Sequence, residues 1–162
     1  MLIDNSLILD NNLTLTTTGS STNYIDTIGA AGGQAQISGI NSIQGGYDAY
    51  ESNWFEAIVT AAMTTGGTSL DVSLWTANVV SNIWTTGNAG SYPTAVANQT
   101  ILLLDSGVVL AASLTKGAVI IKGRLPANCQ RYISAFYKCV GTFTGGGTLC
   151  AMLMPDVDIN LT

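Results

Sequence analysis

The chain has 162 residues and a mass of 16.8 kDa, which fits one domain and leaves no room for a typical second one. Only 9% of its residues are charged, against about 25% in an average globular protein, and 47% are hydrophobic. The net charge of −5 and the pI of about 4.2 argue against nucleic-acid binding, because phosphates call for a basic face.

The first 18 residues alternate loosely between apolar and polar side chains and show no helical periodicity. Leu7 and Leu9 belong to the apolar row, so one edge of this segment could add as a strand to a sheet of a neighbouring molecule. We therefore predict either an extended N-terminal arm over residues 1–18 or the first strand of the chain's own fold. Residues 19–162 are predicted to form the single remaining domain.

Residues 19–46 are rich in Gly, Ser, Asn and Ala, which predicts loops around one or two short strands anchored by Tyr24, Ile25 and Ile28. Period-2 alternation then predicts a series of strands. They cover residues 54–62, 69–76, 100–104, 108–112, 118–125, 131–140 and 149–154. In the segment 69–76 the alternation predicts one buried face and one solvent-exposed face.

Turn-forming residues separate these strands. Thr64 to Gly67 and Gly145 to Gly147 predict hairpins, Asp105 to Gly107 predicts a turn, and residues 86–98 predict a polar loop. About eight antiparallel strands without a convincing helix indicate an all-β jelly-roll sandwich with an extended N-terminal arm. An immunoglobulin-like sandwich is the alternative, but the Cys–Trp–Cys spacing of that fold is missing.

The residues needed for common catalytic chemistry are scarce. The chain contains no histidine, which removes the commonest general base and metal ligand. Glu51 with Glu56, or Asp48 with Glu51, are the densest carboxylate pairs, and we interpret them as solvated charges or subunit contacts. Asp156 and Asp158 offer too few oxygens for calcium. We predict a protein that is not an enzyme and has no catalytic residue, cofactor or metal.

The aromatic residues and glycines allow a second interpretation. Six aromatic residues could stack on sugars: Trp54, Trp75, Trp84, Tyr47, Tyr50 and Tyr92. Trp54 and Trp75 could equally fill the space between two sheets. Gly32-Gly33 and Gly145 to Gly147 lack the Gly-Lys-Ser/Thr ending of a phosphate-binding loop, so they are interpreted as turns.

The cysteines and the N-terminus bear on the compartment. Cys129, Cys139 and Cys150 are odd in number and widely spaced, which indicates free thiols in a reducing cytoplasm. The start Met-Leu-Ile-Asp-Asn lacks the features of a signal peptide, and no apolar run reaches the ~20 residues of a membrane span. We expect synthesis in the cytoplasm and no membrane partner.

The charged residues are segregated along the chain. Eight acids and no base precede residue 116, and all five bases lie between Lys116 and Lys138 without an acid among them. Such segregation can build complementary contact surfaces, or it can arise by chance at so low a charge density. The low charge itself predicts a surface covered by other subunits, hence a homo-oligomer. The alternative is a monomer with a Thr/Ser/Asn surface.

Three segments resemble a known family. They are Met1 to Asp4 with Leu7-Ile8-Leu9, Ser21 to Asp26, and Gly117 through Arg124-Leu125-Pro126 to Arg131-Tyr132-Ile133. In this order they resemble the jelly-roll capsid cement, or decoration, proteins of short-tailed bacteriophages of the Bordetella-phage type. The segments Ile37 to Tyr50 and the loop near Trp84 depart from that pattern.

The resemblance implies a virion protein on the outer capsid surface that clamps neighbouring copies of an HK97-like major capsid protein. It also implies a homo-oligomer, a dimer or a trimer. The contact candidates are Arg124, Pro126, Arg131 and Tyr132, together with Leu7 and Leu9 of the arm. We expect both arginines to anchor the turn at Pro126 through hydrogen bonds to carbonyls or to an acid. The alternative function is a carbohydrate- or receptor-binding jelly roll of a phage tail fibre.

Overall fold

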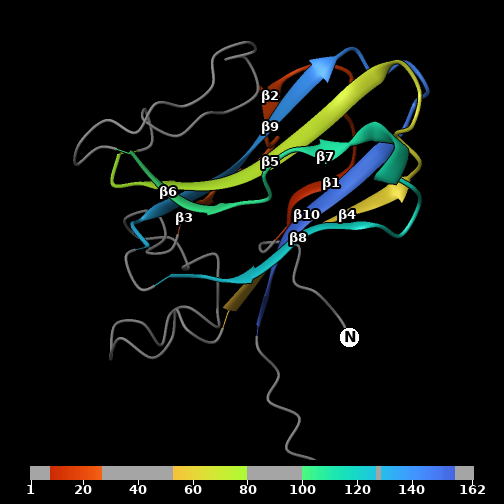
Figure 1. Cartoon of the computed structure of the whole chain (residues 1–162). Helices are drawn as coiled ribbons and strands as arrows, with labels where there is room; N and C mark the ends of the chain where they lie inside the picture. The colour runs from red at the N-terminus through yellow and green to blue at the C-terminus, as the bar shows by residue number, and fades with distance from the viewer. Residues whose placement is uncertain (1–7, 27–52, 80–99, 127–128, 156–162) are drawn as a thin grey trace, which may run out of the picture.

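Segments with alternating side chains become strands. The computed structural model describes residues 8–26, 53–79, 100–126 and 129–155, and these residues contain ten strands and one short 3₁₀ turn (Figure 1). In chain order the strands are β1 (Ile8–Thr14), β2 (Gly19–Ser20), β3 (Ile25–Asp26), β4 (Asn53–Ala61), β5 (Gly67–Ala77), β6 (Thr100–Asp105), β7 (Val109–Leu110), β8 (Val119–Arg124), β9 (Tyr132–Gly141) and β10 (Thr148–Pro155). The predicted all-β class is confirmed.

The strands form two antiparallel sheets. Sheet A has the order β1-β10-β4-β8, and sheet B has the order β2-β9-β5-β6. Strand β3 continues the position of β2 along β9, and β7 continues the position of β6 along β5. The described chain therefore occupies eight strand positions, four in each sheet.

These positions pair as in one long hairpin that is rolled up. The first strand position pairs with the last, the second with the one before the last, and so on inward. The pairs are β1 with β10, β2 and β3 with β9, β4 with β8, and β5 with β6 and β7. Rolling then adds β10 to β4 in sheet A and β5 to β9 in sheet B. This is the order of a jelly roll, as the sequence predicts.

Short connections gather at one end of the sandwich, on the right of Figure 1. Residues 15–18, 62–66, 111–118 and 142–147 each carry the chain from one sheet to the other. Backbone hydrogen bonds join them: Phe143 N–H donates to Thr16 at 2.9 Å, and Met63 N–H donates to Leu114 at 2.9 Å. At the opposite end of the sandwich the chain leaves strands β3, β5 and β8.

The hairpins predicted at residues 64–67 and 145–147 are wrong. Strands β4 and β5 lie in different sheets, and so do β9 and β10. The glycines still make tight turns, since Gly66 has φ +86° and a Cβ there would meet the carbonyl oxygen of Thr142 at 2.5 Å. A turn signal shows that the chain reverses, but it does not identify the strand that pairs next.

The strand predicted over residues 108–112 is shorter than expected. Only Val109 and Leu110 pair with β5, and residues 111–113 form the 3₁₀ turn. Ala111 and Leu114, which are 7% and 0% exposed, anchor this turn in the core.

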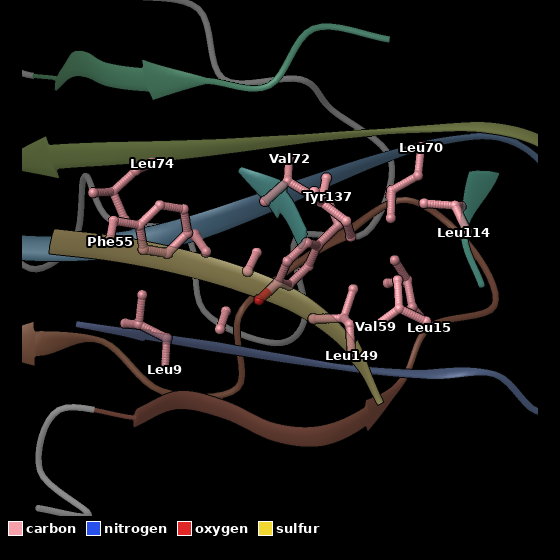
Figure 2. Close-up of a cluster of buried hydrophobic side chains, with 14 of the residues drawn as sticks. Leu9, Leu15, Phe55, Val59, Leu70, Val72, Leu74, Leu114, Tyr137 and Leu149 are labelled. Carbon is pink, nitrogen blue, oxygen red and sulfur yellow. The ribbon is translucent and has the colours of Figure 1, made fainter. Parts of the chain in front are cut away.

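The core lies between the sheets and consists of inward-pointing rows. Leu70, Val72 and Leu74 of β5 point toward Phe55 and Leu149 of sheet A (Figure 2). Burial of each large apolar side chain contributes about 1.5–3 kcal/mol. This inward face of β5 is the one that the alternation predicts.

The solvent-exposed face predicted for β5 is wrong except at Asp71, which is partly exposed, since Ser69 is only 5% exposed. Ser73 and Trp75 point away from the core, yet they are only 1% and 3% exposed. The Trp75 indole N–H donates a hydrogen bond to Ser73 Oγ at 2.8 Å, which satisfies the ring nitrogen in this buried position. Trp75 therefore does not fill the space between the sheets.

A buried carboxyl group bridges the two sheets. Register shifts in β1 turn Asp10 inward beside Leu9, and Asp10 is 1% exposed. The Tyr137 hydroxyl on β9 donates to Asp10 Oδ2, and the Thr22 N–H donates to Oδ1 at 2.8 Å. Burial raises the pKa of Asp10, and these hydrogen bonds oppose the rise.

Residues 8–14 form the first strand of the chain's own sheet A, one of the two alternatives for the N-terminal segment. Leu9 is 0% exposed and belongs to the core, so it offers no contact to another molecule. Leu7 lies outside the described residues, as does Ile28.

We predict that Tyr137→Phe lowers the free energy of unfolding by about 1–3 kcal/mol, because the buried Asp10 loses one hydrogen-bond donor. Urea unfolding measures this change. Tyr132→Phe is the matched control, since Tyr132 is partly exposed and its change should stay within about 0.5 kcal/mol. Equal losses in the two variants would contradict the role of the bridge.

Candidate functional site

The outward side of sheet A carries the first candidate surface. Residues of β4 and β10 that alternate with core positions point outward, and their cross-strand register arranges them in three rows. The rows are Met154–Trp54–Arg124, Met152–Glu56–Lys122 and Cys150–Ile58–Val119. We call these nine residues the sheet A outer patch.

The composition of this patch is unusual for a sheet face that points away from the core. Six of its nine residues are apolar, whereas the outer face of an antiparallel sheet is normally polar. Val119 is 50% exposed, and Trp54, Ile58 and Met152 are partly exposed. Trp, Met and Arg are enriched at protein–protein interfaces. The patch has the composition of a protein-binding surface.

Two charge contacts border the apolar rows. Lys122 Nζ lies 3.1 Å from Glu56 Oε2, and the Arg124 guanidinium lies over the Trp54 ring, 5.2 Å from its centroid. Trp54 therefore lies on the outside of sheet A rather than between the sheets. Among the charged side chains described in the patch, the bases outnumber the acid by one.

The predicted contact residues gather around the β8–β9 connection. Arg124 ends β8, Tyr132 begins β9, and Pro126 and Arg131 lie in the connection between them, where the Cys129 N–H donates to the Pro126 carbonyl at 3.3 Å. The Arg131 guanidinium lies 4.8 Å from the centroid of the Tyr132 ring. Each arginine thus packs on an aromatic ring, a contact that the expected hydrogen bonds did not include.

Tyr132 and Trp54 lie at the same end of the molecule but on different faces. Tyr132 meets Tyr24 edge to face at 5.7 Å, on the outer side of sheet B. The basic window of the sequence is divided in the same way. Lys122 and Arg124 belong to the sheet A outer patch, and Lys138 lies opposite Asp71 on sheet B.

Sheet B has a second exposed apolar surface, where β5 changes its partner from β6 to β7. Ser69 lies in register between Leu110 of β7 and Val140 of β9, and the two apolar side chains leave it only 5% exposed. Leu110 is 61% exposed, Val140 is 49% exposed, and the neighbouring Val108 is 71% exposed.

Two carboxyl groups flank these apolar residues. Asp71 of β5 and Asp105 at the end of β6 lie close together on the outer side of sheet B, since Asp105 is in register with Ser73, two residues after Asp71. Burial and the nearby carboxyl group of Asp105 raise the pKa of Asp71 to about 6, against a smaller opposing effect of Lys138. The Gly107 N–H donates to Asp105 Oδ1 at 2.7 Å. We call Asp71, Asp105, Val108, Leu110 and Val140 the sheet B corner.

Sequence reasoning missed Asp10, Asp71 and Asp105 as interacting groups. Asp71 stands in a regular alternation and was expected to be solvated, and its partner lies 34 residues further along the chain. No local signal reveals this pair, because the register of β6 on β5 creates it. For Asp10, the sequence did offer a signal of burial, because this acidic residue stands within a row of apolar residues.

The catalytic and metal-site expectations concern few described residues. Glu56 is engaged with Lys122, whereas Asp48, Glu51, Asp156 and Asp158 lie outside the described ranges, as do residues 37–50 and Trp84. Within the described part of the chain, no three His, Cys, Asp or Glu residues come together as metal ligands would. No helix there is long and apolar enough to cross a membrane.

The three cysteines are free thiols. Burial raises the pKa of Cys129 to about 12 and that of Cys139 to about 12. Burial and the nearby Asp10 also raise the pKa of Cys150. All three side chains therefore stay protonated and weakly nucleophilic at neutral pH.

Comparison of the chain with protein-family models and with curated proteins finds no match.

We predict that the melting temperature falls as the pH rises from about 4 to about 7. The pKa of Asp71 is about 6 in the folded state against an ordinary value of 3.8, so the folded protein binds this proton more tightly than the unfolded chain does. This stabilisation is complete below the unfolded pKa and is lost as the pH passes the folded pKa. The raised pKa of Asp10 acts in the same direction.

Asp71→Asn isolates the contribution of the pair. In dilute solution the variant should show a flatter dependence of melting temperature on pH and should melt above the wild type at pH 7.5. Asp105→Asn is the matched variant and should flatten the curve less, since it removes the charge of Asp105 but leaves the burial of Asp71, which is the largest cause of its raised pKa. Parallel curves for the wild type and both variants would rule out this role.

Proposed function

We propose that this protein is a non-enzymatic virion structural protein that binds the outer surface of a phage capsid and cements neighbouring major capsid proteins. The sheet A outer patch carries the proposal as a contact surface for another protein subunit, because six of its nine outward residues, Trp54 among them, are apolar and Arg124 packs on Trp54. The jelly-roll order and the family resemblance of three sequence segments also support it.

Such a protein acts by binding and needs no reaction. It stabilises the assembled shell by mass action when it binds the shell and not its separated subunits. Each contact can be weak, because many copies on one lattice, or several subunits in one oligomer, add to a strong attachment. The partners would be an HK97-like major capsid protein and further copies of the chain. The proposed location is the outer capsid surface, after synthesis in the host cytoplasm.

A sugar-binding tail-fibre domain is the alternative function, and it requires aromatic ring faces open to ligand. The Arg124 guanidinium covers a face of Trp54, and the Arg131 guanidinium covers a face of Tyr132. Trp75 is 3% exposed. For the aromatic residues that the structure describes, these contacts favour protein binding, in which Trp, Tyr and Arg supply much of the affinity.

We predict that purified virions of the encoding phage contain this protein in a fixed ratio to the major capsid protein, in far more copies than any tail protein. Quantitative mass spectrometry of intact particles measures the ratio. Surface biotinylation before disassembly should label the protein as strongly as an externally exposed standard. Only a few copies per particle would favour the tail-fibre alternative, and absence from the particle would reject both.

A further inference from the structure

The molecule carries two exposed apolar surfaces on opposite sides of the sandwich. The sheet A outer patch belongs to one sheet and the sheet B corner to the other. Along the strands, the residues of both surfaces alternate with residues that point into the core between the sheets. Val119 in the patch is 50% exposed, and Leu110 in the corner is 61% exposed. Exposed apolar groups of this kind mark interaction sites.

The charges on the two surfaces are of opposite sign. In the patch, Lys122 and Arg124 stand against one acid, Glu56. In the corner, Asp71 and Asp105 stand against one base, Lys138. Each surface thus combines apolar residues with an excess of the charge opposite to that of the other surface, an arrangement that selects partners and fixes their register.

Self-pairing of either surface does not use this complementarity. Two patches face to face would bring Lys122 and Arg124 of one copy near the same residues of the other, with Glu56 as the only described acid on each side. Two corners would likewise bring carboxyl groups together. Pairing of patch with corner places unlike charges together and covers the apolar residues of both.

We propose that copies of this chain associate head to tail, with the sheet A outer patch of one copy on the sheet B corner of the next. This inference rests on the homo-oligomer in the proposed function and names the two surfaces that form it. The interface is heterologous, so it generates a closed ring when the rotation between copies closes, and an open chain otherwise.

The carboxyl pair gives this association a pH dependence opposite to that of folding. Asp71 and Asp105 attract cations best when both are ionised, and the groups that face Asp71 are Asp105, Lys138 and the Ser106 hydroxyl. Binding of Lys122 and Arg124 from another copy therefore favours the ionised form of Asp71 and releases its proton. Association strengthens between pH 5 and pH 7.5, whereas the stability of the isolated fold decreases over this range.

Cysteine cross-linking between two differently labelled variants tests the pairing. Val119→Cys places a thiol in the patch and Leu110→Cys places one in the corner, both at exposed positions. With a short bis-maleimide, a mixture of the two variants should give at least ten times more cross-linked dimer than either variant alone. Mass spectrometry identifies the 119–110 linkage and separates it from products of the three native cysteines.

Val79→Cys provides the matched control, since Val79 is 52% exposed and lies outside both surfaces. Its mixture with Val119→Cys should stay at background. Linkage of Val119→Cys to itself in the absence of the second variant would show patch-to-patch pairing and overturn the inference. Melting temperatures near that of the wild type ensure that each variant is folded, and sedimentation at pH 5 and pH 7.5 checks the predicted strengthening.

The cross-linking result and the virion result are independent. A 119–110 linkage in a protein that is absent from virions would sustain the head-to-tail pairing and reject the capsid function. A protein that is abundant on virions but gives no 119–110 linkage would sustain the function and overturn the pairing.

Discussion

The alternation of side chains on the central strands is the constraint on which the structure depends. Strands β4, β5, β9 and β10 have neighbours on both sides, so each of their side chains points either into the core or outward. The inward rows, such as Leu70, Val72 and Leu74, build the core between the sheets. The outward rows cannot also join that core. Where they are apolar, they are covered by other parts of the chain, as Trp75 is, or form exposed surfaces.

The pairing pattern determines where those surfaces lie. Because the chain is rolled as a long hairpin, β4 and β10 become neighbours at the centre of sheet A, although Ala61 at the end of β4 and its partner Thr148 at the start of β10 are 87 positions apart in the sequence. This pairing aligns Trp54 with Met154 and Ile58 with Cys150. On sheet B it brings Asp71 beside Asp105 at the point where β5 changes partner. Neither surface exists within a single local segment.

The sequence therefore predicts the elements better than their partners. Alternation identified the strands around Val72, Ile121 and Phe136, because each strand records its own burial pattern. It did not reveal that β5 is buried on its outer side near Ser73 and Trp75, because that depends on tertiary contacts. Glycine turns indicated reversals but wrongly suggested hairpins. Arg124 and Arg131 flank Pro126 in the sequence itself, whereas their contacts with the rings of Trp54 and Tyr132 follow from register and rotamer.

Hydroxyl-radical footprinting across a range of protein concentrations tests most directly whether the outward apolar rows are contact surfaces. Methionine and tryptophan are readily oxidised, and Met152, Met154 and Trp54 lie together in the sheet A outer patch. We predict that their oxidation falls as the protein associates, while Met63, which is 1% exposed in the core, stays slow throughout. Oxidation of Met152, Met154 and Trp54 at the same rate in the dilute and the associated protein would contradict the assignment of this face as an interface.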